Sequence, residues 1–298
     1  MKNRSVHLLV IIAALAAVVT VLSFTVRSSP GQSPGSKSKS PVKPVVLNTG
    51  RSDAPKPNPA SAFTAAAAQN STLRNDVNWT FGGKQQRGWY LYDLLIGKTL
   101  KTDRESVTDD FAASLASWQK KRGLSPSGVL DEHSLMAMVS HWQSNRLKNR
   151  TYAELDQLTT APPSDFYDPA RVAELRQVEQ RTYAAYKEMV AAAIADPELK
   201  VKPADKYFKI ISAFRSREYQ DELRRKSPNA GSAGLAINSP HFTGRALDIY
   251  VGGLPVDTKD SNRAIQVNTP AYQWLVRNAE RFGFRPYFYE PWHWEYVK

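Results

Sequence analysis

The segment SPHFTGRALDIY, residues 239–250, places a histidine and an aspartate seven positions apart around a glycine. Residues 246–251 read as a strand, whose side chains point alternately to opposite faces, so Asp248 would face away from the apolar core side. A carboxylate among apolar neighbours needs a partner, because an unpaired buried charge is costly. His241 comes just before this strand, and Gly244 would let the intervening loop fold back. We therefore expect His241 and Asp248 to converge on one point, where they could hold a metal ion.

A third ligand is required, because a catalytic zinc ion is typically bound by three protein ligands and keeps a fourth position for water. His293 is the only other histidine in the second half of the chain, and the alternation of EPWHWEY around it indicates a strand that faces a cleft. The chain has no cysteine, so any metal would be bound by His, Asp or Glu. A structural alternative stays open, in which His241 caps a turn, Asp248 pairs with an arginine such as Arg245, and His293 packs among aromatic rings. The presence of both histidines beside acidic residues favours the metal site.

Hydrolysis at such a site also needs a group that moves a proton. Zinc lowers the pKa of a bound water from about 16 towards about 7, which makes hydroxide available at neutral pH. Glu290 and Glu295 are the nearby carboxylates. Glu295 shares the strand face of His293 and stays a candidate, but the bend at Pro291 would let Glu290 reach over the metal. We therefore expect Glu290 to be the base.

Two short patterns in this region resemble a known family. Residues 239–248 read Ser-x-His-x-x-Gly-x-Ala-x-Asp and residues 290–293 read Glu-x-x-His, as in the zinc D-alanyl-D-alanine carboxypeptidases of the VanY type and their dipeptidase and endopeptidase relatives. The resemblance covers about residues 205–298. It implies a peptidoglycan stem peptide as the substrate and Glu290 as the catalytic base. It also implies one zinc ion per chain, bound by His241, Asp248 and His293.

The segment SAFRSREYQ, residues 212–220, extends this resemblance. It is similar to the family's Tyr-Arg-Ser-x-x-x-Gln segment, with Phe214 in the tyrosine position. It implies three substrate-binding residues, Arg215, Ser216 and Gln220. The guanidinium of Arg215 suits bidentate recognition of a terminal carboxylate, but in this family it can instead stabilise the oxyanion, so both roles stay open. Ser239 is expected to bond the substrate backbone, although a turn residue before a proline explains it almost as well.

The resemblance leaves the specificity open. The expected activity is that of a D,D-carboxypeptidase, which removes the terminal D-alanine. L,D-carboxypeptidases and endopeptidases of the same family differ in pocket walls that the sequence does not define. Outside the enzyme class, the alternative is a binding module that holds wall peptides without hydrolysis. An intact Glu290 beside a complete ligand set favours an enzyme, since a binder needs no base.

The order of helices and strands after residue 150 predicts an α+β domain, residues 151–298, with a mainly antiparallel sheet. Alternating apolar residues predict strands, and apolar residues at helical spacing predict helices. The expected elements are a long helix from Val172 to Val190, a strand at 207–214, a helix at 217–226, a strand at 246–251, a helix from Pro270 to its end at Gly283, and an extended aromatic tail.

Residues 63–150 are predicted to form a small all-α domain. One face of a helix is formed by four apolar residues, Val107, Phe111, Leu115 and Trp118. This helix should end at Gly123, and a second should begin at Asp131. The stretch 109–138 resembles the peptidoglycan-binding domain attached to many wall hydrolases, although it departs from that pattern at Ser127, Asp131 and Ser134. A helical spacer without a ligand is the alternative. Because the expected catalytic residues all lie later, we expect a chain without residues 63–150 to keep its turnover of a soluble peptide.

The N-terminal residues predict a membrane anchor and a tether. After the basic MKNR, residues 8–26 carry no charge, which is long enough to cross about 30 Å of hydrocarbon as a helix. Residues 1–26 are therefore expected to form an uncleaved transmembrane helix, a cleaved signal peptide being the alternative. Residues 27–62 are rich in Pro, Ser, Lys and Gly, a composition typical of a disordered linker. The catalytic domain is then expected outside the cytoplasm, on the periplasmic or cell-wall side, or secreted if the signal is cleaved.

The charge of the chain bears on its partners. The formal net charge is +12, and eight Lys or Arg against one Asp place +7 of it in the first 60 residues. A basic tail after an apolar segment favours attraction to an anionic membrane or cell wall. No nucleic-acid-binding signature occurs in the sequence. The expected partners are peptidoglycan and the membrane, with no nucleic acid, and the oligomeric state is not predicted.

Overall fold

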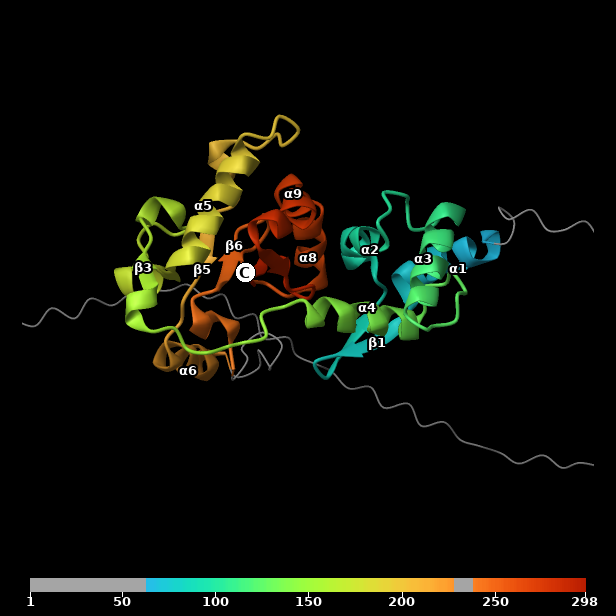
Figure 1. The fold of residues 1–298 in the computed structure, drawn as a ribbon, viewed down its shortest axis with the longest axis horizontal. Coiled ribbons are helices and arrows are strands. Elements are labelled where there is room, and N and C mark those ends of the chain that lie inside the picture. The colour runs from blue at the N-terminus through green and yellow to red at the C-terminus, as the bar shows by residue number, and fades with distance from the viewer. Residues whose placement is uncertain (1–62, 228–237) are drawn as a thin grey trace, which may run out of the picture. The chain divides into compact units, whose positions relative to one another are not determined.

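The computed structural model describes residues 63–227 and 238–298 (Figure 1). The predicted anchor, residues 1–26, and the predicted linker, residues 27–62, lie outside the described residues. Among the helices that the structure describes, none is long and apolar enough to cross a membrane. The described residues all belong to one compact unit.

The N-terminal segment, residues 63–150, consists mainly of helices. Its elements in chain order are α1 (Thr64–Asp76), β1 (Asn78–Phe81), β2 (Lys84–Arg87), η2 (Tyr90–Tyr92), α2 (Asp93–Leu100), α3 (Asp109–Lys121) and α4 (Glu132–Ser144). The prediction of an all-α domain is wrong here, because β1 and β2 pair as an antiparallel hairpin. Gly82 and Gly83 form its turn with φ values of 58° and 76°. Two-residue hairpin turns require such positive φ values, which glycine adopts without strain.

The helix ends of this segment follow the sequence signals. The Thr108 side chain accepts a hydrogen bond from the backbone of Phe111 at the start of α3, and Gly123 has the positive φ of a residue just beyond a helix. Asp131 caps α4 by accepting a hydrogen bond from the backbone of Ser134 at 2.8 Å. Buried Gln119 bonds the loop between the two helices at three of its residues and at the start of α4, which fixes the path of this loop. The predicted end of the first helix and start of the second are therefore confirmed.

The C-terminal segment, residues 151–298, combines helices with a four-stranded sheet. Its helices and turns of 3-10 helix are η3 (Leu155–Gln157), η4 (Pro163–Asp165), η5 (Ala173–Arg176), α5 (Gln180–Ile194), η6 (Pro203–Asp205), α6 (Arg217–Lys226), η8 (Pro240–Thr243), α8 (Asp260–Val267), α9 (Pro270–Asn278) and η9 (Ala279–Phe282). Its strands are β3 (Leu158–Thr160), β4 (Gln177–Glu179), β5 (Ile210–Ser212), β6 (Ala246–Ile249), β7 (Phe284–Pro286) and β8 (His293–Tyr296). The sheet has the order β5-β6-β8-β7 with all neighbours antiparallel, and β3 pairs with β4 in a second antiparallel sheet. The expected α+β class with mainly antiparallel strands is confirmed.

Two predicted elements of this segment are wrong in extent. The long helix expected from Val172 is interrupted, because η5 and β4 occupy the positions before Gln180, where α5 begins. Pairing of β4 with β3 satisfies the backbone there, and Glu179 caps α5 through a hydrogen bond from the backbone of Thr182. The strand expected at 207–214 is limited to β5, where the register with β6 shifts.

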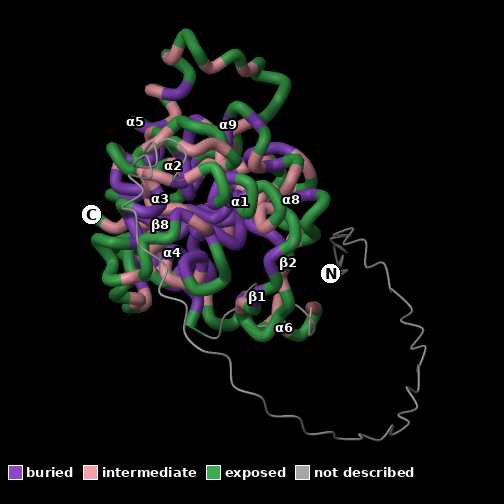
Figure 2. Tube along the Cα trace, turned by 90° about the vertical axis from the view of Figure 1, so that its right-hand side faces the viewer, coloured by how far each residue is buried: buried purple, intermediate pink, exposed green. Residues whose placement is uncertain are grey.

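The two segments share one hydrophobic core. A single cluster of buried residues extends from β1 to β8, and Figure 2 shows buried positions along both segments. Phe288, between β7 and β8, belongs to this cluster. It contacts four aromatic rings of the N-terminal segment, those of Trp79, Phe81, Tyr92 and Trp142. The boundary at residue 150 stays a prediction, but the shared core does not fit the expectation that residues 63–150 can be removed without consequence.

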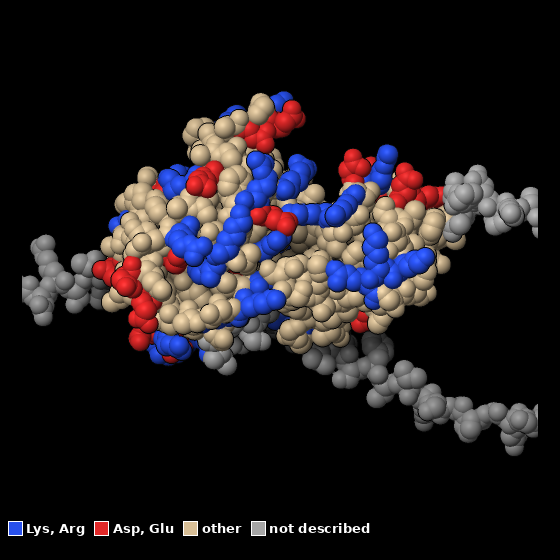
Figure 3. All heavy atoms as spheres, in the orientation of Figure 1, with Lys and Arg blue, Asp and Glu red and all other residues tan. Residues whose placement is uncertain are grey.

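The surface keeps the basic character that the composition predicts. On the face drawn in Figure 3, Lys and Arg side chains are spread over both segments, while Asp and Glu form smaller groups. Basic side chains of the described residues also form ion pairs, as between Lys98 and Glu280, which joins the two segments at 3.2 Å.

Candidate metal centre

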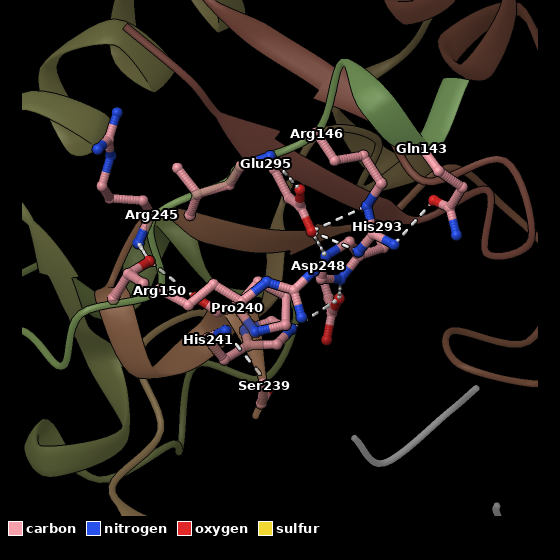
Figure 4. A network of polar contacts seen from close by, with 12 residues as sticks. Gln143, Arg146, Arg150, Ser239, Pro240, His241, Arg245, Asp248, His293 and Glu295 are labelled. Carbon is pink, nitrogen blue, oxygen red and sulfur yellow. Dashed lines mark hydrogen bonds and ion pairs between the residues drawn. The ribbon is translucent and has the colours of Figure 1, made fainter. Parts of the chain in front are cut away.

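Two central strands and the turn before them bring the predicted ligands together. Asp248 on β6 and His293 on β8 are direct cross-strand partners, and His241 lies in η8, just before β6. Their donor atoms all lie within 4.8 Å of one another. All three side chains are at least 96% buried, with exposed fractions of 3% for His241, 2% for Asp248 and 4% for His293. Figure 4 shows them converging from the two strands and the turn.

Gly244 makes this convergence possible. Its φ of 64° belongs to the left-handed region, and its carbonyl accepts a hydrogen bond from the backbone of Glu179 at 3.1 Å. A Cβ atom at this position would lie 2.9 Å from both the backbone nitrogen of Glu179 and the side chain of Leu158. The loop between His241 and β6 therefore needs a glycine both for its conformation and for its close packing.

His241 presents an unprotonated nitrogen to the centre. Its Nδ1 lies 2.6 Å from the carbonyl oxygen of Ala213, which can only accept, so Nδ1 carries the hydrogen. Burial and the nearby Arg215 lower the pKa of His241 to about 4, which keeps the ring neutral at pH 7. Its Nε2 lone pair then faces Oδ1 of Asp248 at 3.3 Å. Two acceptors that face each other in a buried site indicate that a cation belongs between them.

His293 lies between two carboxylates. Its Nδ1 is 2.9 Å from Oδ1 of Asp248, and its Nε2 is 3.3 Å from Oε1 of Glu295. Burial opposes a charge on this ring, but the hydrogen bonds to Asp248 and Glu295 outweigh it and raise the pKa of His293 to about 9. The site therefore stabilises a positive charge at the position where a metal ion would replace the Nδ1 proton.

Asp248 offers one oxygen to the histidines and the other to an arginine. Its Oδ2 accepts a hydrogen bond from Nη2 of Arg215 at 2.6 Å, so Oδ1 alone faces His241 and His293. Burial would raise the pKa of Asp248, but His241 and Arg215 stabilise the carboxylate and hold the pKa well below its usual range. The arginine named in the structural alternative, Arg245, instead donates to the carbonyl of Lys298.

The donor set fits a metal ion of the zinc type. Tetrahedral zinc binds nitrogen and oxygen at about 2.1 Å, which places two ligands about 3.4 Å apart. The separations from Asp248 Oδ1 are 3.3 Å to His241 and 2.9 Å to His293. Two imidazoles and one carboxylate form a three-ligand set of the kind that leaves a coordination position open. These three residues can therefore hold a metal ion.

Glu290 lies in the turn before β8. Its backbone nitrogen donates to Tyr287, and its carbonyl accepts from the backbone of His293 at 2.9 Å. Its side chain is 8% exposed, and no described residue donates a hydrogen bond to its carboxylate. Burial is the largest cause that raises the pKa of Glu290 to about 7, with His293, Asp248 and Arg215 as its charged neighbours. A carboxyl group with this pKa can both accept and release a proton near neutral pH.

Arg215 and Gln220 lie at the same centre. The Nε of Arg215 donates to Ser212 at 3.0 Å, and its Nη1 lies 3.4 Å from Oε1 of Gln220. The hydroxyl of Ser216 caps α6 by accepting from the backbone of Tyr219. That of Ser239 accepts from the backbone of His241. The structure thus connects Arg215 and Gln220 to Asp248, while the hydroxyls of Ser216 and Ser239 stabilise neighbouring turns and their role in substrate binding stays a prediction.

Some residues of the centre had no signal in the sequence. Arg146 and the backbone of Leu147 bind Glu295, from about 149 positions away. Ala213 contributes only a backbone carbonyl. Such contacts between distant segments leave no pattern in spacing or periodicity.

Comparison with known proteins supports this picture. The family model VanY, described as D-alanyl-D-alanine carboxypeptidase, matches residues 175–298. No curated protein matches. Among solved structures, the chain is similar to one described as the LdcB LD-carboxypeptidase, at 23% identity and a TM-score of 0.35, over 50% of this chain and 71% of that chain. A similarity at this score carries no argument about function. The family match covers all three candidate ligands and Glu290, and residues 175–298 are therefore a domain of the VanY carboxypeptidase family.

Proposed function

We propose that this chain is a zinc peptidase that hydrolyses peptidoglycan stem peptides, as a D-alanyl-D-alanine carboxypeptidase that removes the terminal D-alanine. One observation carries the proposal. A buried His-Asp-His group lies beside Glu290, whose pKa is raised to about 7. The family match of residues 175–298 supports a carboxypeptidase, and its description supports the D,D specificity.

His241, Asp248 and His293 would hold the zinc ion, which when bound acidifies water and polarises the scissile carbonyl. Ala213 fixes the His241 tautomer through Nδ1, and Arg215 fixes the rotation of the Asp248 carboxylate through Oδ2. These contacts orient the donor atoms before any ligand arrives, which reduces the cost of reorganisation.

Glu290 would act as the general base and then as the general acid. Its carboxylate takes a proton from the attacking water and gives it to the amine of the departing D-alanine. A pKa of about 7 suits both steps, because each protonation state is well populated near neutral pH. Low exposure of the side chain keeps bulk water from competing for the proton.

Arg215 would bind the negative charge of the substrate. Three of its five N–H hydrogens have acceptors among the described residues, which leaves one on each Nη atom for an anionic group. This group is either the terminal carboxylate of the stem peptide or the oxyanion that forms during hydrolysis. Gln220, Ser216 and Ser239 would complete the proposed substrate-binding set.

Digestion of purified muropeptides tests the function. The full chain with zinc should remove one D-alanine from a pentapeptide stem, as seen by mass spectrometry. Glu290→Gln keeps the size of the side chain but removes the base, so its rate should fall by about 10²- to 10⁴-fold with little change in peptide affinity. The matched control Glu295→Gln should lose far less at saturating zinc. Equal loss in both variants, or loss in Glu295→Gln alone, would contradict the role of Glu290.

The products also separate the alternatives. Loss of D-alanine from tetrapeptide stems alone would indicate an L,D-carboxypeptidase, and conversion of cross-linked dimers to monomers would indicate an endopeptidase. Binding of stem peptides without any cleavage by the zinc-loaded chain would support the binding module instead.

The location of the protein is part of the proposal. A peptidoglycan substrate lies outside the cytoplasm, so the catalytic domain would be on the periplasmic or cell-wall side, tethered by residues 1–26 and 27–62 or released after signal cleavage. Accessibility of the C-terminal segment to an added protease in intact spheroplasts, and fractionation with the membrane, test this placement.

A further inference from the structure

Glu295 is a fully buried carboxylate in the middle of the sheet. It lies on β8 opposite Ala246 of β6 and Arg285 of β7, and its side chain is 0% exposed. Its Oε1 faces Nε2 of His293, the ring nitrogen on the far side from Asp248. A carboxylate in this position needs strong partners, because burial of an unpaired charge is costly.

Those partners come from the end of the N-terminal segment. Arg146, two residues after α4, donates from both Nε and Nη2 to Oε1 of Glu295. The next residue, Leu147, donates its backbone N–H to Oε2 at 2.8 Å. Both carboxylate oxygens are thus bound by two consecutive residues, and Figure 4 shows Arg146 reaching Glu295 beside the metal centre.

Arg146 is itself fixed on two further sides. Its Nη1 donates to the side chain of Gln143, on the last turn of α4, at 3.0 Å. Its guanidinium also lies 3.9 Å from the ring centre of Tyr287, in the turn that carries Glu290. The arginine therefore cannot move without breaking contacts to α4, to the sheet and to this turn.

The geometry points to Arg146 as a positioning residue for the metal centre. We propose that it holds the Glu295 carboxylate against Nε2 of His293, so that Nδ1 of this ring stays aimed at the metal position. A carboxylate on the outer nitrogen of a ligand histidine fixes the ring orientation and strengthens its donor atom. The N-terminal segment then takes part in metal binding as well as in any contact with the wall. The inference rests on the metal centre of the proposed function. It adds that residues of the N-terminal segment fix the orientation of one metal ligand.

Metal affinity of the full chain tests this role directly. Arg146→Met keeps a long apolar stem but removes the hydrogen bonds to Glu295. Zinc affinity, measured by competition with a chromophoric chelator, should fall about 10- to 100-fold, and the visible spectrum of the cobalt-substituted chain should change because the ligand field changes. The matched control is Arg245→Met, since Arg245 contacts Lys298 and the Tyr296 ring and not Glu295. This control should keep the affinity and the spectrum of the unmodified chain.

A double-mutant cycle shows whether Arg146 acts through Glu295. If it does, Arg146→Met should change zinc affinity little once Glu295→Gln is present. If the two residues act independently, the loss should be the same in both backgrounds within about twofold, and that result would overturn the proposal. So would a lower thermal stability of the metal-free Arg146→Met chain together with an unchanged zinc affinity, because the role would then be structural.

The same measurements separate this inference from the proposed function. If the unmodified chain binds no zinc, both the proposed function and the positioning role of Arg146 are overturned. A chain that binds zinc and cleaves stem peptides, but whose zinc affinity is unaffected by Arg146→Met, would overturn only the positioning role.

Discussion

Replacement of Phe288 by alanine should destabilise both segments of the chain together. The ring is 2% exposed in the turn between β7 and β8. Its centre lies 4.7 Å from that of Phe81, 5.4 Å from that of Tyr92 and 5.7 Å from that of Trp142. All three belong to the N-terminal segment, so the substitution would leave a cavity between the two segments.

The size of the effect follows from the burial. Truncation of a buried phenylalanine to alanine costs about 3–5 kcal/mol, since it loses apolar burial and leaves a cavity. For a unit of this length, each kcal/mol lowers the melting temperature by about 2–4 °C. The melting temperature should therefore fall by about 6–20 °C. Turnover should fall as well, because Glu290 lies two residues beyond the altered site.

Thermal unfolding followed by circular dichroism and calorimetry measures this effect. The matched control is Phe282→Ala, because Phe282 is only partly buried and its ring stacks on Trp274 at 6.4 Å within the C-terminal segment. We expect the folded part of the unmodified chain to unfold in one transition, and the Phe288→Ala variant to shift the whole transition by more than the control. Two separate transitions, with only one of them shifted, would refute the reasoning that the segments share one core.

Three further predictions follow from the centre and its supports. Asp248→Ala should lose both bound zinc and activity, because two ligands seldom retain a catalytic ion; full zinc content after dialysis, measured by metal analysis, would contradict the ligand assignment. Gly244→Ala should lower the free energy of unfolding in urea by more than about 1 kcal/mol, since a side chain at positive φ would also clash with Glu179 and Leu158; an unchanged midpoint would show that the loop relaxes. Deletion of residues 63–150 should abolish turnover of a soluble pentapeptide, because it uncovers the shared core; normal turnover by the shortened chain would restore the view of a separable domain.

The convergence of His241, Asp248 and His293 was predictable because each part of it depends on local chemistry. The alternation of side chains along a strand placed Asp248 and His293 on defined faces of the sheet. Gly244 can adopt the positive φ that lets the loop fold back, which explained how His241 reaches the same point. Helix ends at Asp131 and Gly123 were predictable for a similar reason, since caps depend on residues that are close in sequence. The bend that carries Glu290 was also predictable, because Pro291 lies in the same segment. The raised pKa of Glu290 was not, because it depends on burial that the sequence does not show.

The predictions from sequence were wrong where the pairing of two strands decides the local structure. Apolar residues from Val172 onward have helical spacing, yet β4 forms there because β3 is available to pair with it. The β1–β2 hairpin arose within a segment predicted to be helical, because a Gly-Gly turn lets two short strands meet. Local preferences are weak compared with the free energy of backbone pairing and burial, so tertiary contacts override them.

The sequence by itself determined which residue types could form the candidate centre, and it predicts His241, Asp248 and His293 as metal ligands, Glu290 as the base and Arg215 as the group that binds negative charge. The tertiary structure alone decided what holds these groups in place. Arg146 meets Glu295 across 149 positions, and Phe288 is buried in rings that lie about 150 to 210 positions earlier. The physical reason is that a buried charge or ring is stabilised by whichever atoms surround it in space, and neither residue type nor spacing along the chain records which atoms those are.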